Sequence, residues 1–333
     1  MRIVVTGGHG FIGTLLWQEL AQRGVFDGRS IDEIVLVDRV TRTVGQPPGV
    51  GMTRIDSVGG DLLDVIDGVF DEPVDVLFHL AAAVSSECEA DFDLGMRANV
   101  DATRALLSAA RAQHEGGGPT VRFVFSSSVA VYGPDPVLPL PPVVSESTLP
   151  TPQSSYGAEK LVGEQLIAEH TRRGLLDGRV ARLMTVCVRP GAPNAAASSF
   201  VSGVLREPLS GVEAVCPVRP DLPLAIASPA TTIAGLLALA EAARGDAPGQ
   251  LSGRLPVNLP ALTVTVQGML DALARHGGPE ARSLVRMQDD PRIDAIVRSW
   301  PSRFDNTRAL ALGLEPDPSI DAIVEQYLAT TTR

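Results

Sequence analysis

The chain has 333 residues, enough for one large lobed domain or for two of ordinary size. Hydrophobic residues make up 44% of it and aromatic residues only 4%, so aliphatic side chains must build the core, as they do in layered α/β packing. The net charge of −11 repels phosphate backbones, which argues against nucleic acid as a partner.

Short apolar runs alternate with helical patterns through the first half of the chain. The runs predict buried parallel strands at Ile3–Val5, Ile34–Val37, Val76–Leu80, Val121–Phe125 and Val180–Val188. Between them, the apolar spacing predicts helices at Phe11–Arg23, Phe92–Gln113 and Tyr156–Arg173. The alternation predicts an α/β fold with a Rossmann-type doubly wound parallel sheet, formed by residues 1–188.

Loops and a less regular second part complete the predicted organisation. The predicted loops are the Gly- and Pro-rich residues 42–60, the short Glu115–Pro119 and the proline-rich Pro134–Pro152, which we expect to wall one side of a site. Further helices are predicted from Ser228-Pro229 through Ala243, at Thr263–Arg275 and at Asp317–Leu328. Residues 189–333 are expected to form a smaller, mainly substrate-binding lobe, with some segments returning to the sheet.

Two further observations narrow the class of protein. No run of about 18 apolar residues exists and the first residues enter a strand pattern directly, so we expect no membrane span, no signal peptide and a cytoplasmic location. The three cysteines, Cys88, Cys187 and Cys216, lie far apart and form no C-x-x-C pair. Neither a disulfide framework nor a metal site is therefore expected.

A glycine-rich turn follows the first predicted strand and leads into the first predicted helix. Gly7, Gly10 and Gly13 stand in the spacing G-x-x-G-x-x-G within Thr6–Gly13. Glycines at these places permit a tight turn, the close approach of a pyrophosphate to a helix N-terminus, and the packing of helix on strand. The turn therefore predicts a dinucleotide site.

Asp38, directly after the second predicted strand, bears on which dinucleotide binds. An acid there accepts hydrogen bonds from both hydroxyls of an adenosine ribose and repels a 2′-phosphate, which favours NAD over NADP. Arg39 follows it, and an arginine at that place is able to hold a phosphate, so the preference stays open. Asp61-Leu62 is placed to meet the adenine edge, although a solvated loop aspartate is an equal alternative. The run Leu80, Ala81, Ala82 and Ala83 ends the third predicted strand, and its small alanine side chains allow backbone to lie against a cofactor.

The strongest catalytic signal is a lysine. Lys160 is the single lysine among 28 basic residues, and it follows Tyr156, one of three tyrosines, by four positions on a predicted helix. Residues i and i+4 share a helix face, so the ammonium is expected to lie near the phenol and to lower its pKa, which makes the phenol a better base.

A row of serines ends the fourth predicted strand. Ser126, Ser127 and Ser128 precede Val129. A hydroxyl at this edge of the sheet is able to hold a substrate oxygen while Tyr156 moves a proton and a nicotinamide moves a hydride. The residues alone do not decide which of the three serines acts.

Together these motifs resemble the extended short-chain dehydrogenase/reductases of the NAD-dependent epimerase/dehydratase type. The matching pieces are TGGHGFIG, Asp38, Asp61-Leu62, HLAAAVS, Asn99 within MRANVDATRALL, SSSVAVYG and YGAEK, and later RFDNTRALALGL. The resemblance implies that Tyr156 is the general acid/base, Lys160 its electrostatic aid and ribose contact, and Ser128 the partner of the substrate oxygen. It implies NAD as the cofactor, held by Gly7, Gly10, Phe11, Ile12, Gly13, Asp38, Asp61, Leu62, Leu80, Ala81, Ala82, Ala83, Asn99, Ser126, Tyr156 and Lys160.

Departures from the family pattern indicate the substrate. Dehydratases carry Asp-Glu after the active serine or threonine, whereas this chain has Val129-Ala130, so elimination of water is not expected. Arg189 stands just past a strand end, where it is able to grip a substrate carboxylate in a forked ion pair; a structural salt bridge is an equal alternative. A small hydroxy acid is therefore the expected substrate, bound by Ser85, Ser127, Ser128, Tyr156, Arg189, Asn194 and Ser199.

The leading interpretation is an NAD-dependent dehydrogenase that oxidises the C2 hydroxyl of a small sugar acid to the 2-keto acid. Within the same family the alternative is a nucleotide-sugar 4-epimerase, which returns the hydride to the other face. A more distant alternative is a regulator that binds the dinucleotide without catalysis. The resemblance also implies a homodimer through a four-helix bundle, to which each chain contributes Phe92–Gln113 and Tyr156–Arg173.

Overall fold

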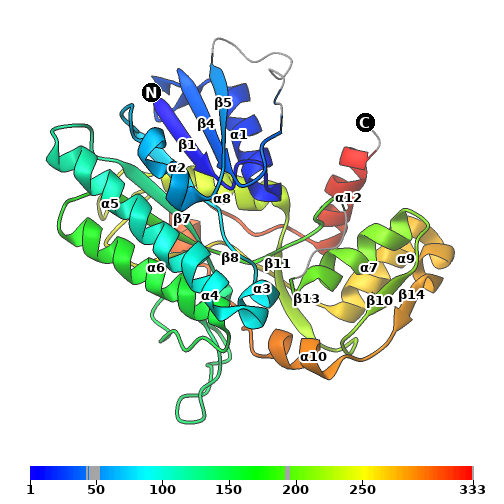
Figure 1. Cartoon of the computed structure of the whole chain (residues 1–333). Helices are drawn as coiled ribbons and strands as arrows, with labels where there is room; N and C mark the ends of the chain where they lie inside the picture. Colours follow the sequence, from blue (N-terminus) through cyan, green and yellow to red (C-terminus); the bar gives the residue numbers. More distant parts are fainter. Residues whose placement is uncertain (43, 45–52, 192–195, 332–333) are drawn as a thin grey trace.

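A seven-stranded sheet forms the centre of the larger lobe, as a computed structural model shows for the whole chain except residues 43, 45–52, 192–195 and 332–333 (Figure 1). All of its neighbouring strands pair in parallel, in the order β12-β8-β7-β6-β1-β4-β5. These strands are β1 (Arg2–Thr6), β4 (Glu33–Asp38), β5 (Arg54–Gly59), β6 (Val76–His79), β7 (Arg122–Ser128), β8 (Asp177–Leu183) and β12 (Val257–Asn258). The order reverses direction at β1, which is the doubly wound topology that the sequence predicts.

Helices cover both faces of this sheet because successive strand residues point to opposite sides. Ile3 and Val5 face a core shared with α1 (Phe11–Arg23) and α8 (Pro229–Glu241). Val4, between them, faces a second core with α2 (Leu62–Val69), α5 (Ala102–Glu115) and α6 (Ser155–Arg172). Both faces of β1 are buried, which explains its continuous apolar run.

Three sequence predictions need correction. The segment 42–60 was expected to be a loop throughout, but residues 54–59 form the edge strand β5, whose mostly exposed side chains carry no apolar run. The expected strand Val180–Val188 divides at Met184 into β8 and β9 (Thr185–Val186), and β9 joins another sheet. The expected helix Phe92–Gln113 contains α4 (Phe92–Gly95), a π-helical turn at Met96–Asp101 and then α5.

A smaller lobe packs around its own core at the carboxyl ends of these strands (Figure 1). Its sheets join β9, β11 (Pro223–Ala227) and β13 (Leu262–Thr265), and separately β10 (Ala214–Cys216) and β14 (Val285–Met287). Its helices are α7 (Ser199–Leu209), α9 (Val266–Ser283), α10 (Pro291–Arg298) and α12 (Ile320–Thr331). From the same half of the chain, β12 forms one edge of the large sheet, and α8 and α11 (Thr307–Ala311) pack against that sheet.

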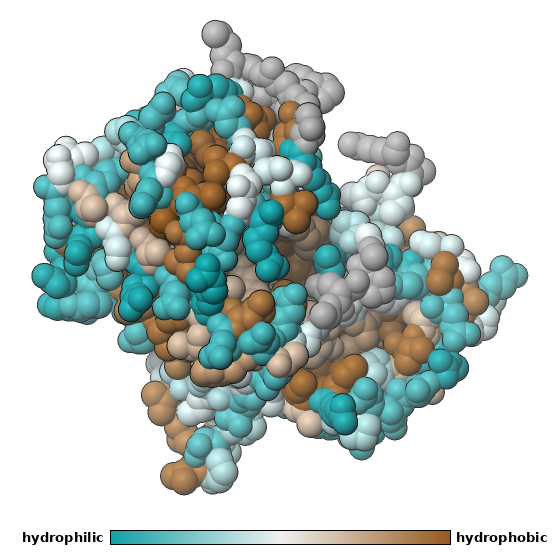
Figure 2. Space-filling model, viewed as in Figure 1, coloured by the Kyte–Doolittle hydropathy of each residue, from teal (hydrophilic) through white to brown (hydrophobic). Residues whose placement is uncertain are grey.

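A hollow lies between the two lobes, and Figure 2 shows hydrophobic residues in its depth. Chain crossings on opposite faces leave such a crevice where a doubly wound sheet reverses its strand order, here between β1 and β6. In the part of the chain that the structure describes, no helix is long and apolar enough to cross a membrane. The three cysteines are buried and unpaired.

Candidate active site

The glycine turn lines a pocket of about 570 Å³ at the carboxyl end of β1. Gly7 has φ +70°, a conformation that favours glycine, and a side chain there would meet the backbone nitrogen of Ala81 at 2.8 Å. A side chain at Gly13 would collide with the carbonyl oxygen of Gly7. Gly10 is the N-cap of α1 and leaves the N–H groups of the first turn without a side-chain partner, which suits an anion.

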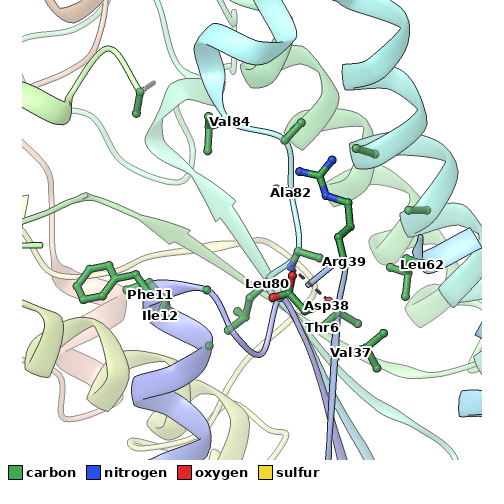
Figure 3. A pocket seen from close by; sticks show the side chains of 18 of the residues that line it. Thr6, Phe11, Ile12, Val37, Asp38, Arg39, Leu62, Leu80, Ala82 and Val84 are labelled. Atoms are coloured by element: carbon green, nitrogen blue, oxygen red, sulfur yellow. Dashed lines mark hydrogen bonds between the residues drawn. The ribbon is translucent and has the colours of Figure 1, made fainter. Parts of the chain in front are cut away.

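The remaining expected cofactor residues mostly line the same pocket. Phe11, Ile12, Asp38, Asp61, Leu62 and the run Leu80 to Ala83 all border it. Figure 3 shows Phe11 and Ile12 on one side of Leu80, and Asp38 and Arg39 on the other. The side-chain oxygen of Asp38 accepts a hydrogen bond from the backbone N–H of His9 at 3.0 Å. The glycine turn therefore holds the Asp38 carboxylate at the pocket wall, which Arg39 also lines.

Two of the expected cofactor residues have structural partners. Asp61 caps α2, because its carboxylate accepts a hydrogen bond from the backbone N–H of Leu63 at 3.0 Å. The same carboxylate pairs with Arg97. The hydrogen bond from Leu63 and, to a smaller degree, the pairing with Arg97 hold the pKa of Asp61 below its usual value. Asn99 lies behind the pocket wall, not in it. Its side chain accepts from the backbone N–H of Ala83 at 2.8 Å and donates to the buried Glu159 carboxylate at 2.6 Å. Asn99 thus ties the loop after β6 to the helix α6, and its sequence assignment as a cofactor contact is corrected accordingly.

A second pocket, of about 280 Å³, adjoins the first and contains the catalytic candidates Ser128, Tyr156 and Lys160. Ile12, Leu80, Ala82 and Val84 line both pockets, so the two are continuous at the floor.

The sequence places these three side chains together through helix packing. Ser154 caps α6 by accepting from the N–H of Gly157 at 3.1 Å. A side chain at Gly157 would collide with the Ala130 carbonyl oxygen, so glycine lets α6 lie close to the end of β7. Tyr156 consequently reaches Ser128, with which it shares a side-chain hydrogen bond.

The electrostatics of the pair differ from the sequence expectation. Burial raises the pKa of Tyr156 to about 12, and the hydrogen bond with Ser128 only partly opposes this. Burial also lowers the pKa of Lys160 to about 8, because a charged ammonium loses its hydration there. The Lys160 nitrogen lies 5.7 Å from the centre of the Tyr156 ring and 4.6 Å from that of Phe125. Burial is the largest influence on the Tyr156 pKa, so the predicted lowering of this pKa was wrong.

The three serines have different partners, which separates their roles. The Ser126 hydroxyl donates to the carbonyl of His79, and the Ser127 hydroxyl donates to the buried Glu164 carboxylate, which also pairs with Arg182. Ser128 accepts from the backbone N–H of Ala130 and keeps its hydroxyl hydrogen for another partner. The geometry therefore favours Ser128 over Ser127 as the serine that acts with Tyr156.

The expected substrate residues divide between the two pockets. Ser85, Ser127, Ser128 and Tyr156 line the smaller one, whereas Arg189 and Ser199 line the larger one. Asn194 lies outside the described residues. Sequence reasoning missed Thr185 and Trp300, which line the smaller pocket from the second lobe. No local signal marks them, because the folding of distant segments brings them to β7.

Comparisons with known proteins identify the family. The model of the "NAD dependent epimerase/dehydratase family" matches residues 3–219. The chain belongs to this family. The family's name includes the cofactor that the glycine turn predicts. Curated relatives covering 98% of the chain are named D-erythronate dehydrogenase, one from Cupriavidus necator at 46% identity over 98% of its length and one from Haemophilus influenzae at 41% over 99%.

Similar solved structures confirm the fold. A crystal structure described as a nucleoside-diphosphate-sugar epimerase from Agrobacterium tumefaciens is 35% identical, with a TM-score of 0.88 over 99% of this chain and 94% of that one. The L-threonine 3-dehydrogenase of Trypanosoma brucei, at 23% identity, has a TM-score of 0.79 over 99% of this chain and 96% of that one. The second likeness concerns the fold alone.

Replacing Asp38 by asparagine tests the discrimination between NAD and NADP. The change removes a negative charge from the pocket wall and leaves Arg39 in place. Like charges brought together cost several kcal/mol, so Asp38→Asn is expected to shift the ratio of kcat/KM for NADP over NAD upward by about tenfold or more. Initial rates with each dinucleotide measure this ratio. Asp67→Asn, on the exposed side of α2, is the matched control, and an equal shift there would contradict the role of Asp38.

Proposed function

We propose that this protein is an NAD-dependent dehydrogenase that oxidises the C2 hydroxyl of D-erythronate to the 2-keto acid. The observation that carries the proposal is a small pocket with Ser128, Tyr156 and Lys160 that opens into a glycine-lined dinucleotide pocket. The names of two relatives, 46% and 41% identical over nearly their whole lengths, support the choice of substrate.

The cofactor fits the residues that are present. Gly7, Gly10 and Gly13 leave room where side chains would block a dinucleotide, and the Asp38 carboxylate suits the hydroxyls of an adenosine ribose. When bound, NAD supplies the hydride acceptor. The residues of the chain bind it, orient the sugar acid and move the proton.

In the proposed reaction Tyr156 removes the proton of the C2 hydroxyl while the hydrogen on C2 leaves as hydride. Ser128 donates a hydrogen bond to that oxygen and fixes its distance from the tyrosine. Lys160, held against the rings of Phe125 and Tyr156, carries a positive charge below about pH 8 and stabilises the phenolate that forms when Tyr156 gives up its proton. Ser85, Thr185 and Ser198 supply polar contacts to the other oxygens, and Trp300 limits the length of the acid.

A 4-epimerase of nucleotide sugars is the second candidate, because the similar Agrobacterium tumefaciens structure is described as one. Such a substrate has several times the bulk of a four-carbon acid, and the pocket beside Tyr156 encloses only about 280 Å³. The size of this pocket favours the acid.

An initial-rate assay at 340 nm separates the two activities. With NAD and D-erythronate we expect NADH to accumulate in proportion to the acid consumed, and little formation from hexuronates. An epimerase returns its hydride within each turnover and produces no net NADH. Absence of NADH with every acid, together with interconversion of nucleotide sugars, would replace the dehydrogenase by the epimerase.

We also propose a cytoplasmic homodimer formed through α4, α5 and α6. Phe92 on α4 and Val162 on α6 are exposed apolar side chains on these helices, which supports a covered face. The expected mass in solution is twice 35.0 kDa. Light scattering that gave the mass of a single chain at micromolar concentration would contradict the dimer.

A further inference from the structure

Arg189 lies in the dinucleotide pocket instead of the pocket that holds Tyr156. Val186 and Ser198, on either side of it in the chain, line both pockets, whereas Arg189 lines only the larger one. Arg189 therefore stands on the dinucleotide side of the junction between the two pockets. This is where the two halves of a bound dinucleotide would be joined.

A second arginine, Arg206, holds the backbone of Arg189 in place. Arg206 on α7 donates from its guanidinium to the carbonyl oxygen of Arg189 at 2.6 Å, and the backbone N–H of Arg189 donates to the Ser202 hydroxyl at 2.9 Å. Arg206 also pairs with Glu207. These two hydrogen bonds hold the backbone of Arg189 against α7, and neither of them involves the Arg189 guanidinium.

The charge of Arg189 has no counter-charge in the part of the chain that the structure describes. No carboxylate there lies within ion-pair distance of its guanidinium, although most other arginines have such a partner. Burial and the neighbouring Arg206 both lower the pKa of Arg189, in that order of size. A partly buried cation without a partner beside a second cation is a place where an anion is stabilised.

The opposite side of the pocket offers a matching feature. The N-terminus of α1 begins after Gly10, and its first turn contains no acidic residue. The other charged groups of this pocket, Asp38, Arg39, Asp61 and Arg97, come from the ends of β4 and β5 and from the π-helical turn, on the adenosine side. Arg189 and Arg206 are thus the cations of the second lobe that share a pocket with the helix end.

We propose that Arg189, supported by Arg206, binds the pyrophosphate of NAD from the second lobe, so that the pyrophosphate lies between this arginine pair and the N-terminus of α1. Two negative charges would then meet a guanidinium on one side and backbone N–H groups on the other. The inference rests on the proposed function only for the identity of the cofactor. It assigns Arg189 to the cofactor, whereas the sequence alone suggests that Arg189 binds the substrate carboxylate.

Binding measurements without any sugar acid test the assignment. The proteins are the full chain, Arg189→Met, Arg189→Lys and, as a control, Arg219→Met at an exposed place. Isothermal titration with NAD, ADP-ribose and AMP gives the dissociation constants. A lost charged hydrogen bond predicts at least about a tenfold weaker binding of NAD and ADP-ribose to Arg189→Met, a smaller effect on AMP, and an intermediate one for Arg189→Lys.

The outcomes separate the alternatives. Unchanged binding of NAD by Arg189→Met, with a tenfold higher KM for D-erythronate, would overturn the proposal and make Arg189 the carboxylate clamp. Unchanged binding and unchanged KM would overturn it as well. Should Arg189→Met fail to fold, Arg189→Lys decides in the same way. If the full chain oxidises no acid but Arg189→Met still weakens the binding of NAD and ADP-ribose, the proposed function fails while this assignment stands.

Discussion

Tyr156→Phe is expected to lower kcat by about 10²–10⁴-fold while the affinity for NAD stays within twofold, because general acid–base catalysis contributes a factor of that size. The hydroxyl that shares a hydrogen bond with Ser128 is lost, and the ring that borders the pocket remains. Because burial raises the pKa of Tyr156 to about 12, the phenolate is scarce at neutral pH. The rate of oxidation by the unmodified protein should therefore rise from pH 6 toward pH 8, the range in which Lys160 still carries its charge.

Steady-state rates from pH 6 to 10 and titration with NAD measure both parts of this prediction. Tyr327→Phe, in α12 of the second lobe, is the matched control and should keep full activity. The residual activity of Tyr156→Phe should lack the rise from pH 6 toward pH 8. A kcat within threefold of the unmodified value would show that another group moves the proton.

Lys160→Met is expected to abolish most activity and yet to stabilise the fold at neutral pH. Burial lowers the pKa of Lys160 from its ordinary 10.5 to about 8, so the unfolded chain holds this proton more tightly than the folded one. The buried charge then costs about 3 kcal/mol below pH 8, and this cost disappears as the pH rises through 10.5. Methionine fills a similar volume without the charge.

Urea unfolding at several pH values checks this prediction. At pH 7 the free energy of unfolding of Lys160→Met should exceed that of the unmodified protein by about 1–3 kcal/mol, and the difference should shrink toward zero near pH 10.5. Activity at pH 7 should fall at least about a hundredfold, because the phenolate loses its nearby positive charge. A variant that is less stable at pH 7 by the same amount would mean that the ammonium stabilises the fold.

Local patterns explain which parts of the fold could be predicted. Some parts of the site depend only on residues close together in the chain, so their spacing predicts how they are arranged. These are the glycines of the first turn, Asp38 at the end of its strand, and Tyr156 and Lys160 on one helix face. The edge strand β5 was not predicted because most of its side chains are exposed to solvent, so its sequence has no run of apolar residues. The strands of the second lobe have two to five residues and lack a readable period.

Contacts between distant segments explain the rest of the site. Asn99 is polar and lies near the cofactor loop, but the π-helical turn directs it to Ala83 and Glu159 behind that loop. Burial of Tyr156 raises its pKa where the neighbouring lysine was expected to lower it, and sequence alone does not reveal the degree of burial. Trp300 reaches the catalytic pocket only after the second lobe has folded.

The transfer of deuterium from labelled substrate tests the central claim most directly. D-Erythronate labelled with deuterium at C2 is incubated with the protein and NAD, and the nucleotide product is analysed by mass spectrometry. The account predicts that each NADH formed carries one deuterium, and that acid labelled at C3 gives unlabelled NADH. Labelled NADH from the C3-labelled acid, or no NADH from either, would contradict oxidation at C2.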